Sequence, residues 1–407
     1  MALPSKTCIW RQNIYNLCYC IYNAEYLMKI TKIEAIPLKR RLEQYFEGGT
    51  YRIVNRDTIV TRIYTDEGHV GEVFGGDEDH TQEKVIHVIR DIFAPLLVGE
   101  DPNNVERIWA KMFSQKVDLG NRSIHILDLY NHAVFTQAIA AVDNALWDML
   151  GKIHNLPVYK MLGGYRDRVP IIAIGGYYEA EKGQNDLNQE MLHYKEIGMA
   201  GVKFKVGRTT VKEDIQRVSE VRKLVGDDFI VVCDANQAWT PREAIEFCRL
   251  AEDLKLGWIE EPVRWYDQFE GLKMVRDSTN IPVNAGQGEI SAFGCRDLII
   301  RNSVDILNVD VTIAGGVTEW RRIAQMAQLF HVDMAHHEEP QIALHLLAAF
   351  PNTLYVEIFP NYKRDPMWID LPLEHPVVRD GYMELPDKPG FGIDLNPDVI
   401  EKYRVDR

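Results

Sequence analysis

Three acidic side chains in the second half of the chain follow short apolar runs that read as successive strands. Asp234 ends the run 229–234, Glu260 ends the run 257–260, and Glu289 lies in the loop after the next run. Three carboxylates so placed form a hard oxygen site, which suits Mg²⁺ with positions left open for a substrate. Zinc would favour His or Cys ligands, and the cysteines of this chain are badly placed for it. We therefore predict one Mg²⁺ per active site.

A pair of lysines, Lys203 and Lys205, lies in the apolar run 201–206. Alternate residues of a strand point the same way, and a barrel strand has no solvated edge, so both side chains should face the barrel mouth. A neighbouring lysine and a metal ion depress the pKa of an ammonium group, which makes Lys205 a candidate neutral base. A divalent cation holds a substrate carboxylate and stabilises the enediolate that forms when the α-proton leaves. The predicted chemistry is removal of the proton α to a carboxylate.

Further polar residues end the later apolar runs. Asp310 could hold one ring nitrogen of His337 and leave the other facing the substrate, so Lys205 and His337 would be bases on opposite faces. His336 should point away from the lumen and is the alternative base. Glu357 lies in the last run.

Each of these residues has an ordinary structural explanation when taken alone. Asp234 could begin a helix, the glutamates could be surface residues at loop starts, and His337 could be a satisfied interior histidine. Their joint occurrence at the ends of consecutive strands is difficult to explain by packing, because buried parallel strands are normally apolar throughout.

The elements that must position these residues are read from the apolar pattern. Eight short runs, separated mostly by amphipathic helical segments, predict a TIM-like α/β barrel, with a doubly wound sheet as the alternative. These runs are 169–174, 201–206, 229–234, 257–260, 281–285, 305–309, 332–336 and 354–358. Active sites of such barrels form at the C-terminal ends of the strands.

The first part of the chain has a different pattern. Strands are predicted at 30–37, 58–64 and 69–74, followed by helices at about 80–93, 102–114 and 131–154. We expect an α+β capping domain over 28–160, a barrel domain over 161–385, and a C-terminal tail, 386–407, that packs back on the capping domain. Residues 1–27 are interpreted as an N-terminal extension, either loose or a misassigned start.

Composition narrows the class of protein. The chain has 407 residues and a net charge of −14, which argues against a nucleic-acid partner. It contains no apolar run long enough to span a membrane. The six cysteines show neither a disulfide framework nor a zinc motif, so a reducing, cytoplasmic setting is expected.

Taken together, the motifs resemble the enolase superfamily, and within it the mandelate racemase subgroup, over about residues 28–395. The resemblance implies a modified (β/α)7β barrel with an N-terminal capping domain. It rests on the sequence motifs Lys203-Phe204-Lys205, Asp234-Ala235-Asn236, Trp258-Ile259-Glu260-Glu261-Pro262, Gly288-Glu289, Gly315-Gly316 and His336-His337.

The resemblance also implies roles for individual residues. Lys205 and His337 would be the bases, with Asp310 as the partner of His337. Lys203 and Asn236 would help to bind substrate, and Glu357 would hydrogen-bond the enediolate. Asp234, Glu260 and Glu289 would be the metal ligands. The Glu260 to Glu289 spacing is longer than in mandelate racemase, with Gln287 inserted near the third ligand.

Most similar members of the subgroup are acid-sugar dehydratases, which are hydro-lyases, so dehydration of a sugar acid is the leading hypothesis. A racemase or epimerase of a 2-hydroxy acid is the alternative, a cycloisomerase is a third option, and a non-catalytic binding protein is a fourth. The family likeness and the long apolar face of 131–154 suggest a homo-oligomer, from dimer to octamer, that binds a small carboxylate.

Two loops of the capping domain are expected to close over the barrel mouth. The first, about 42–52, offers Tyr45, Phe46 and Tyr51, of which Tyr45 is our candidate for substrate contact. The second, about 74–80, carries Asp77, Glu78 and His80. Its polar character suits a hydroxylated substrate, although an ordinary acidic surface loop would look the same. Tyr45 and His336 complete the candidate substrate-binding set.

Overall fold

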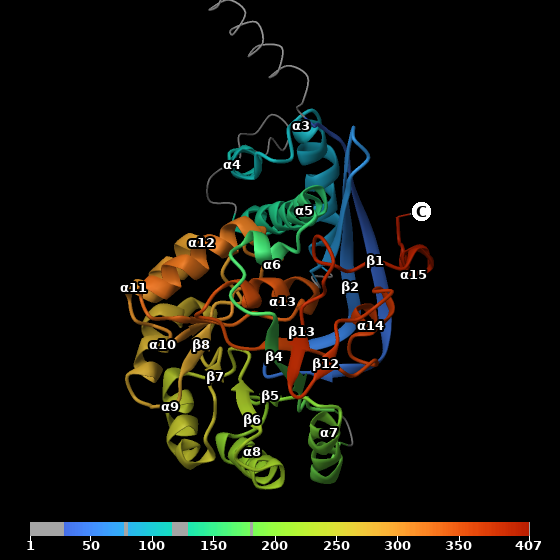
Figure 1. Ribbon diagram of the computed structural model, residues 1–407. Helices are drawn as coiled ribbons and strands as arrows, with labels where there is room; N and C mark the ends of the chain where they lie inside the picture. Colours follow the sequence, from blue (N-terminus) through green and yellow to red (C-terminus); the bar gives the residue numbers. More distant parts are fainter. Residues whose placement is uncertain (1–27, 77–79, 116–128, 180–181, 407) are drawn as a thin grey trace, which may run out of the picture.

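The computed structural model describes residues 28–76, 80–115, 129–179 and 182–406. Its N-terminal part is built on a three-stranded antiparallel sheet of order β1-β2-β3 (Figure 1). The strands are β1 (Ile30–Glu47), β2 (Arg52–Thr65) and β3 (Val70–Gly75). The predicted strands are present, but β1 and β2 extend much further toward each other than the sequence pattern indicated. The predicted extension 1–27 lies outside the described residues.

Helices cover one face of this sheet. They are α2 (Gln82–His87), the π-helix η1 (Val88–Phe93), α3 (Ala94–Leu97) and α5 (Leu129–His154), whereas α4 (Val105–Phe113) packs against α5 and α12. Helix α5 lies between the sheet and the barrel helix α12, as Figure 1 shows, and it contacts β2, β3 and α12. Its apolar face is therefore covered within the chain and gives no support to the expected oligomer, which stays a prediction.

The second part is a parallel barrel, reached through α6 (Val158–Met161). Its strands are β4 (Arg168–Gly175), β5 (Gly201–Lys205), β6 (Ile230–Asp234), β7 (Ile259–Glu260), β8 (Val283–Ala285), β9 (Ile306–Leu307), β10 (Asp333–Met334) and β11 (Val356–Ile358). Each of the eight lies within, or within one residue of, a predicted run. Strand pairing follows chain order from β4 to β10, and β11 pairs with β4. Between β10 and β11, Met334 exchanges backbone hydrogen bonds with Asn352 and Leu354 at 2.7 and 2.9 Å.

Seven longer helices alternate with the barrel strands. They are α7 (Gln184–Glu196), α8 (Val211–Val225), α9 (Pro241–Leu250), α10 (Gln268–Arg276), α11 (Ala292–Ile300), α12 (Gly316–Leu329) and α13 (Pro340–Ala349). Short 3₁₀ turns, η2 (Glu252–Leu254) and η3 (Trp265–Asp267), lie beside α9 and α10. Helices α8 and α9 both begin with a capping box, in which a threonine and a glutamate three residues later satisfy free backbone N–H groups. The fold is the predicted TIM-like (β/α)7β barrel with an N-terminal capping domain.

The C-terminal segment returns to both parts of the molecule. It contains α14 (Pro366–Asp370), β12 (Val378–Arg379), β13 (Tyr382–Glu384) and α15 (Pro397–Tyr403). Strand β13 pairs antiparallel with the start of β4. Beyond α15, the backbone N–H of Val405 donates to the carbonyl oxygen of Pro37 on β1 at 3.1 Å. No helix in the described ranges has both the length and the apolarity needed to cross a bilayer.

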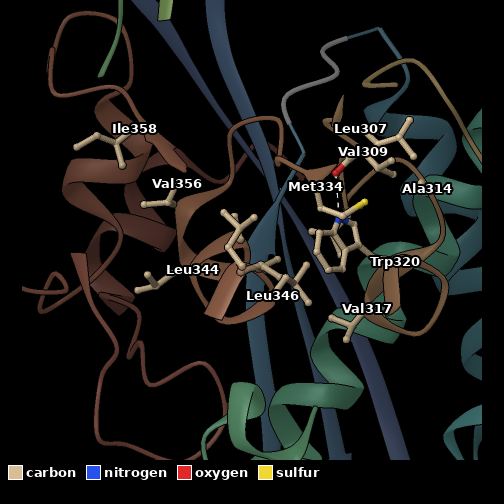
Figure 2. Close-up of a cluster of buried hydrophobic side chains, with 14 of the residues drawn as sticks. Leu307, Val309, Ala314, Val317, Trp320, Met334, Leu344, Leu346, Val356 and Ile358 are labelled. Atoms are coloured by element: carbon tan, nitrogen blue, oxygen red, sulfur yellow. Dashed lines mark hydrogen bonds between the residues drawn. The ribbon is translucent and has the colours of Figure 1, made fainter. Parts of the chain in front are cut away.

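Apolar side chains fill the space between the barrel strands and the surrounding helices. Figure 2 shows Trp320 of α12 against Leu307, Val309 and Met334, and the indole Nε1–H donates to the carbonyl oxygen of Val309 at 3.1 Å. All of these residues are buried. This packing fixes the ends of β9 and β10, so the polar residues that follow these strands project from a rigid frame.

Candidate active site at the barrel mouth

The register of the barrel strands brings one row of polar residues to the same level. Lys205 of β5 pairs with Asp234 of β6, Asp234 with Glu260 of β7, and Glu260 with Asn284 of β8. Because in-register residues of neighbouring parallel strands point the same way, their side chains share one face of the sheet. All four are buried.

Lys203 lies one layer below this row and links two acids. Its Nζ donates to Glu260 Oε1 at 2.9 Å and to Glu357 Oε2 at 2.6 Å, and all three side chains have no exposed surface. Burial lowers the pKa of Lys203, but the charges of Glu260 and Glu357 outweigh it and raise the pKa overall. Burial, with the charges of Asp234 and Glu357, raises the pKa of Glu260 to about 8 despite Lys203. Lys203 therefore holds an ammonium charge at the floor of the site.

Lys205 contacts Asp234 above that floor. Its Nζ donates to Asp234 Oδ2 at 2.6 Å and lies 5.6 and 5.5 Å from the ring centroids of Tyr51 and Tyr177. Burial lowers the pKa of Lys205, and the Asp234 carboxylate reverses this and raises it. Asn236 also contacts Asp234, with its backbone N–H on Oδ1 at 2.8 Å and its Nδ2 on Oδ2 at 3.0 Å.

His337 lies across the barrel, after β10, between two carboxylates. Its Nδ1 is 3.0 Å from Asp310 Oδ2, and its Nε2 is 3.7 Å from Glu338 Oε1. Thr312 donates to Asp310 Oδ1 from both its backbone N–H and its hydroxyl, at 2.7 Å each, which fixes the aspartate. Burial lowers the pKa of His337, but Glu338 and Asp310 raise it to about 10. The imidazole is therefore held as a cation.

The end of β1 and the turn after it close one side of the mouth. Phe46 is buried against Tyr177 and Phe359, and the Tyr178 backbone N–H donates to the Glu47 carbonyl at 3.1 Å. The hydroxyl of Thr50 donates to the carbonyl oxygen of Asn236 at 2.7 Å. A Cβ on Gly49 would lie 2.3 Å from the Ala235 carbonyl oxygen, so this turn approaches β6 more closely than a larger residue allows.

A cleft of about 340 Å³ remains between this turn and the strand ends. It is lined by Tyr51, His80, Asn236, Gln287, His337 and Glu338, among others. Residues of both domains line the cleft, and they include hydrogen-bond donors and hydrogen-bond acceptors. Asp77 and Glu78 of the second predicted loop lie outside the described residues.

Three predicted site residues are not brought into this arrangement. Tyr45 is 36% exposed and lies beside Arg52, because β1 continues to Glu47 and alternation turns Phe46 inward instead. The predicted loop 42–52 is thus largely strand, and the residue that reaches the cleft is Tyr51. Tyr45 as a substrate contact is corrected accordingly.

His336 is fully buried and points away from the lumen. Its Nε2 accepts the backbone N–H of Val311 at 3.1 Å, and burial lowers its pKa to about 4. His336 therefore stays neutral and fixes the loop after β9, and the prediction that it contacts the substrate is corrected. This placement agrees with the prediction that His336 points away from the barrel lumen.

Glu289 faces the helices rather than the metal-site row. Its Oε1 accepts Gln268 Nε2 of α10 at 2.5 Å, and a Cβ on Gly294 of α11 would lie 1.5 Å from its Oε2. Within the described residues, no group of three or more His, Cys, Asp and Glu side chains could hold a metal ion. The structure thus brings Asp234 and Glu260 together, without Glu289 beside them.

The donor atoms near Asp234 and Glu260 nevertheless suit a hard cation. Within the described part of the chain, Asn236 Oδ1, Asn284 Oδ1, Gln287 Oε1 and Glu357 Oε1 are buried oxygens without a hydrogen-bond partner. Burying an acceptor unpaired is costly, so such oxygens indicate an unfilled bonding role. A set of carboxylate and amide oxygens is the chemistry that Mg²⁺ favours.

Sequence reasoning missed two side chains at the mouth. Glu338 was not among the candidate site residues, yet its Oε1 lies 3.7 Å from Nε2 of His337. Gln287 was treated as an insertion, although it lines the cleft. The signal that could have identified both is their position just beyond a strand end, next to a predicted site residue.

Family comparisons match both parts of the chain. Residues 50–163 match the mandelate racemase / muconate lactonizing enzyme N-terminal domain, and residues 186–399 match the enolase C-terminal domain-like family. The chain is 29% identical over 396 residues to an arabinonate dehydratase of Saccharolobus solfataricus, with 96% of this chain and 97% of that protein covered.

Other relatives carry out different reactions. An L-Ala-D/L-Glu epimerase of Bacillus subtilis is 29% identical, with 90% of this chain and 97% of that protein covered, and cycloisomerases occur at similar identity. Among solved structures, a mandelate racemase/muconate lactonizing enzyme from a marine actinobacterium, in complex with magnesium, is 40% identical. Its TM-score is 0.84, with 93% of this chain and 99% of that chain covered.

Proposed function

Because the chain belongs to the enolase superfamily, in the mandelate racemase and muconate lactonizing enzyme subgroup, we propose that it is a Mg²⁺-dependent sugar-acid dehydratase. The reaction would remove the proton α to the substrate carboxylate and expel the β-hydroxyl as water, giving a 2-keto-3-deoxy acid. Similarity to an arabinonate dehydratase supports the reaction class.

The observation that carries this proposal is the unequal charge environment of Lys205 and His337. Lys205 contacts one carboxylate, Asp234, which is also a candidate metal ligand. His337 lies between two carboxylates, Asp310 and Glu338. An elimination needs a base on one side and a protonated acid on the other, and this pair supplies both.

Three groups would position the substrate carboxylate and stabilise the negative charge that develops on it. Lys203, buried between Glu260 and Glu357, would hold positive charge beneath it. Asn236 would fix Asp234 through its two hydrogen bonds. Asp234 and Glu260 would hold Mg²⁺, which would supply stabilisation of the negative charge on the enediolate. The Asp234 carboxylate would then stabilise the Lys205 ammonium less, so that Lys205 would lose its proton more readily.

The residues would act in the following order. Neutral Lys205 Nζ takes the α-proton, and the C–H electron pair enters the enediolate. The β-carbon–oxygen bond then breaks while His337 Nε2 gives its proton to the departing hydroxyl, so water leaves. The resulting enol takes up a proton at the β-carbon and releases its hydroxyl proton to solvent, which gives the keto acid, and each base returns to its starting state by exchange with solvent.

Racemisation or epimerisation is the second candidate. His337 lines the cleft, and Lys205 lies beside Tyr51, which lines it too, so His337 could return a proton to the face opposite Lys205. An epimerase is among the relatives. In the reverse direction of this reaction His337 would be the base, which requires a neutral imidazole. The flanking carboxylates oppose that state, so the elimination is favoured.

A screen of aldonic and aldaric acids with Mg²⁺ tests the proposal. A dehydratase yields a product that reacts with semicarbazide as a 2-keto acid. A racemase or epimerase changes optical rotation, or incorporates solvent deuterium at the α-carbon, without forming a carbonyl. Deuterium exchange throughout the panel without any keto acid would contradict dehydration and support the second candidate.

A further inference from the structure

The loop after β8 carries an amide where a third carboxylate ligand was expected. Gln287 lies two residues beyond Ala285, the last residue of β8, and lines the cleft beside Asn236 and His337. Its backbone N–H donates to Glu261 Oε1 at 3.2 Å, and the N–H of Gly286 donates to the same oxygen at 2.8 Å. These bonds fix the loop so that the side chain of Gln287 projects into the mouth.

The side-chain oxygen of Gln287 is buried yet unsatisfied. Among the described residues, its Oε1 has no hydrogen-bond partner. A glutamine acceptor in such a place loses its bond to water and gains nothing in return, unless a ligand supplies the missing contact.

The nearby carboxylate of Glu289 already contacts other groups. Glu289 accepts the amide of Gln268 on α10, and its other oxygen fills the space above Gly294 on α11. Moving this side chain to the barrel mouth would break the contact with Gln268 and leave a gap over α11.

Asn284 is the other amide near the row. It is level with Glu260, and its Nδ2 donates to Glu260 Oε2 at 3.2 Å, so the amide is already used to orient that ligand. Asn284, like Asp234 and Glu260, does not line the cleft, whereas Gln287 does. The position of Gln287 is therefore the better one for contact with a ligand that enters from the mouth.

We propose that Gln287 Oε1 is the third protein ligand of the magnesium ion, with Asp234 and Glu260 as the other two. This inference rests on the proposed Mg²⁺ dependence and specifies the site further. The ligand set then carries two negative charges instead of three. Since ligand charge tunes the affinity of oxygen sites for divalent cations, the ion should be held more weakly than by three carboxylates.

The experiment is calorimetric titration of the full chain with Mg²⁺, supported by electron paramagnetic resonance with Mn²⁺. Gln287→Glu restores a third carboxylate and should tighten the dissociation constant about tenfold, whereas Gln287→Leu should weaken it about tenfold. Glu289→Gln is the matched control and should leave the affinity within about twofold. Thermal unfolding without metal checks that each variant is folded.

The outcomes separate this inference from the proposed function. A wild-type protein that binds neither ion would overturn both. Binding by the wild type that is weakened by Glu289→Gln, and unaffected by both Gln287 variants, would assign the ligand to Glu289 and overturn this inference alone. Loss of affinity in Asn284→Leu, with Gln287→Leu unchanged, would assign it to Asn284, again leaving the proposed function in place.

Discussion

The two sides of the barrel mouth carry their ionisable groups in different ways. On the β5 side, Lys205 donates a hydrogen bond to one acid, Asp234, and its ammonium lies beside two aromatic rings. On the β10 side, His337 has an acid at each ring nitrogen, and Asp310 is itself fixed by Thr312. In the proposed reaction the first arrangement loses its proton when Asp234 takes another partner, whereas the second keeps its proton until the departing hydroxyl accepts it. The difference supports the proposal that Lys205 and His337 have separate tasks, as base and as acid.

The largest expected effect comes from the β5 side. Lys205→Met keeps most of the length of the side chain and removes the amine, so both α-proton exchange and dehydration should fall about 10³-fold. Proton nuclear magnetic resonance in D₂O follows the exchange, and semicarbazide follows the keto acid. Retention of exchange near the wild-type rate would show that Lys205 is not the base. The proposed division of roles between the β5 side and the β10 side would then fail.

His337→Asn should separate the two activities. Asparagine can still accept or donate near Asp310 but cannot deliver a proton at neutral pH, so dehydration should fall about 10²- to 10³-fold. Exchange of the α-proton should persist, because Lys205 performs it. Both rates are measured on the same sample. Equal loss of both would mean that the two sides do not divide the reaction as proposed.

Glu338→Gln tests the charge that distinguishes the β10 side. The folded-state pKa of His337 is raised to about 10, from an ordinary value of 6.5, so the ring stays protonated until the pH passes that value. Burial acts in the opposite direction, and Glu338 and Asp310 outweigh it. Removing one anion destabilises the imidazolium, so the alkaline limb of the kcat profile for dehydration should move about one pH unit lower.

A matched variant checks the electrostatic explanation. Glu338→Asp keeps the charge on a shorter side chain and should move the limb less than Glu338→Gln does. Identical shifts in both variants would point to a steric effect. The same raised pKa should make His337 stabilise the fold, with this contribution complete below the ordinary value of 6.5 and lost as the pH rises from there through about 10.

Most of the barrel, and two of the three proposed metal ligands, could be predicted from the sequence for one physical reason. Within a strand, side chains alternate between faces, so an acid at the end of an apolar run has a definite direction. Asp234, Glu260, Lys203 and Lys205 all lie inside strands and are placed accordingly. Closure of the strands was also visible from their number and spacing.

Beyond the strand ends this rule fails. Gly286 has a φ of +124°, a conformation that larger residues rarely adopt, and it redirects the chain before Gln287 and Glu289. No periodicity in the sequence shows which of these two side chains turns inward. Glu338 has a φ of +51° and is likewise outside any regular pattern, so its approach to His337 depended on the three-dimensional structure.

The smallest expected effect concerns the turn that the capping domain places over the β5 side. Tyr51 lines the cleft, and its hydroxyl is 3.4 Å from that of Tyr177, whereas Tyr45 faces outward. Tyr51→Phe removes one polar contact at the mouth and should raise KM about 3- to 10-fold with little change in kcat. Tyr45→Phe should change neither parameter measurably. Because both residues lie beside the same turn, a reversed order would mean that the turn moves on substrate binding and brings the outer face of β1 into the site.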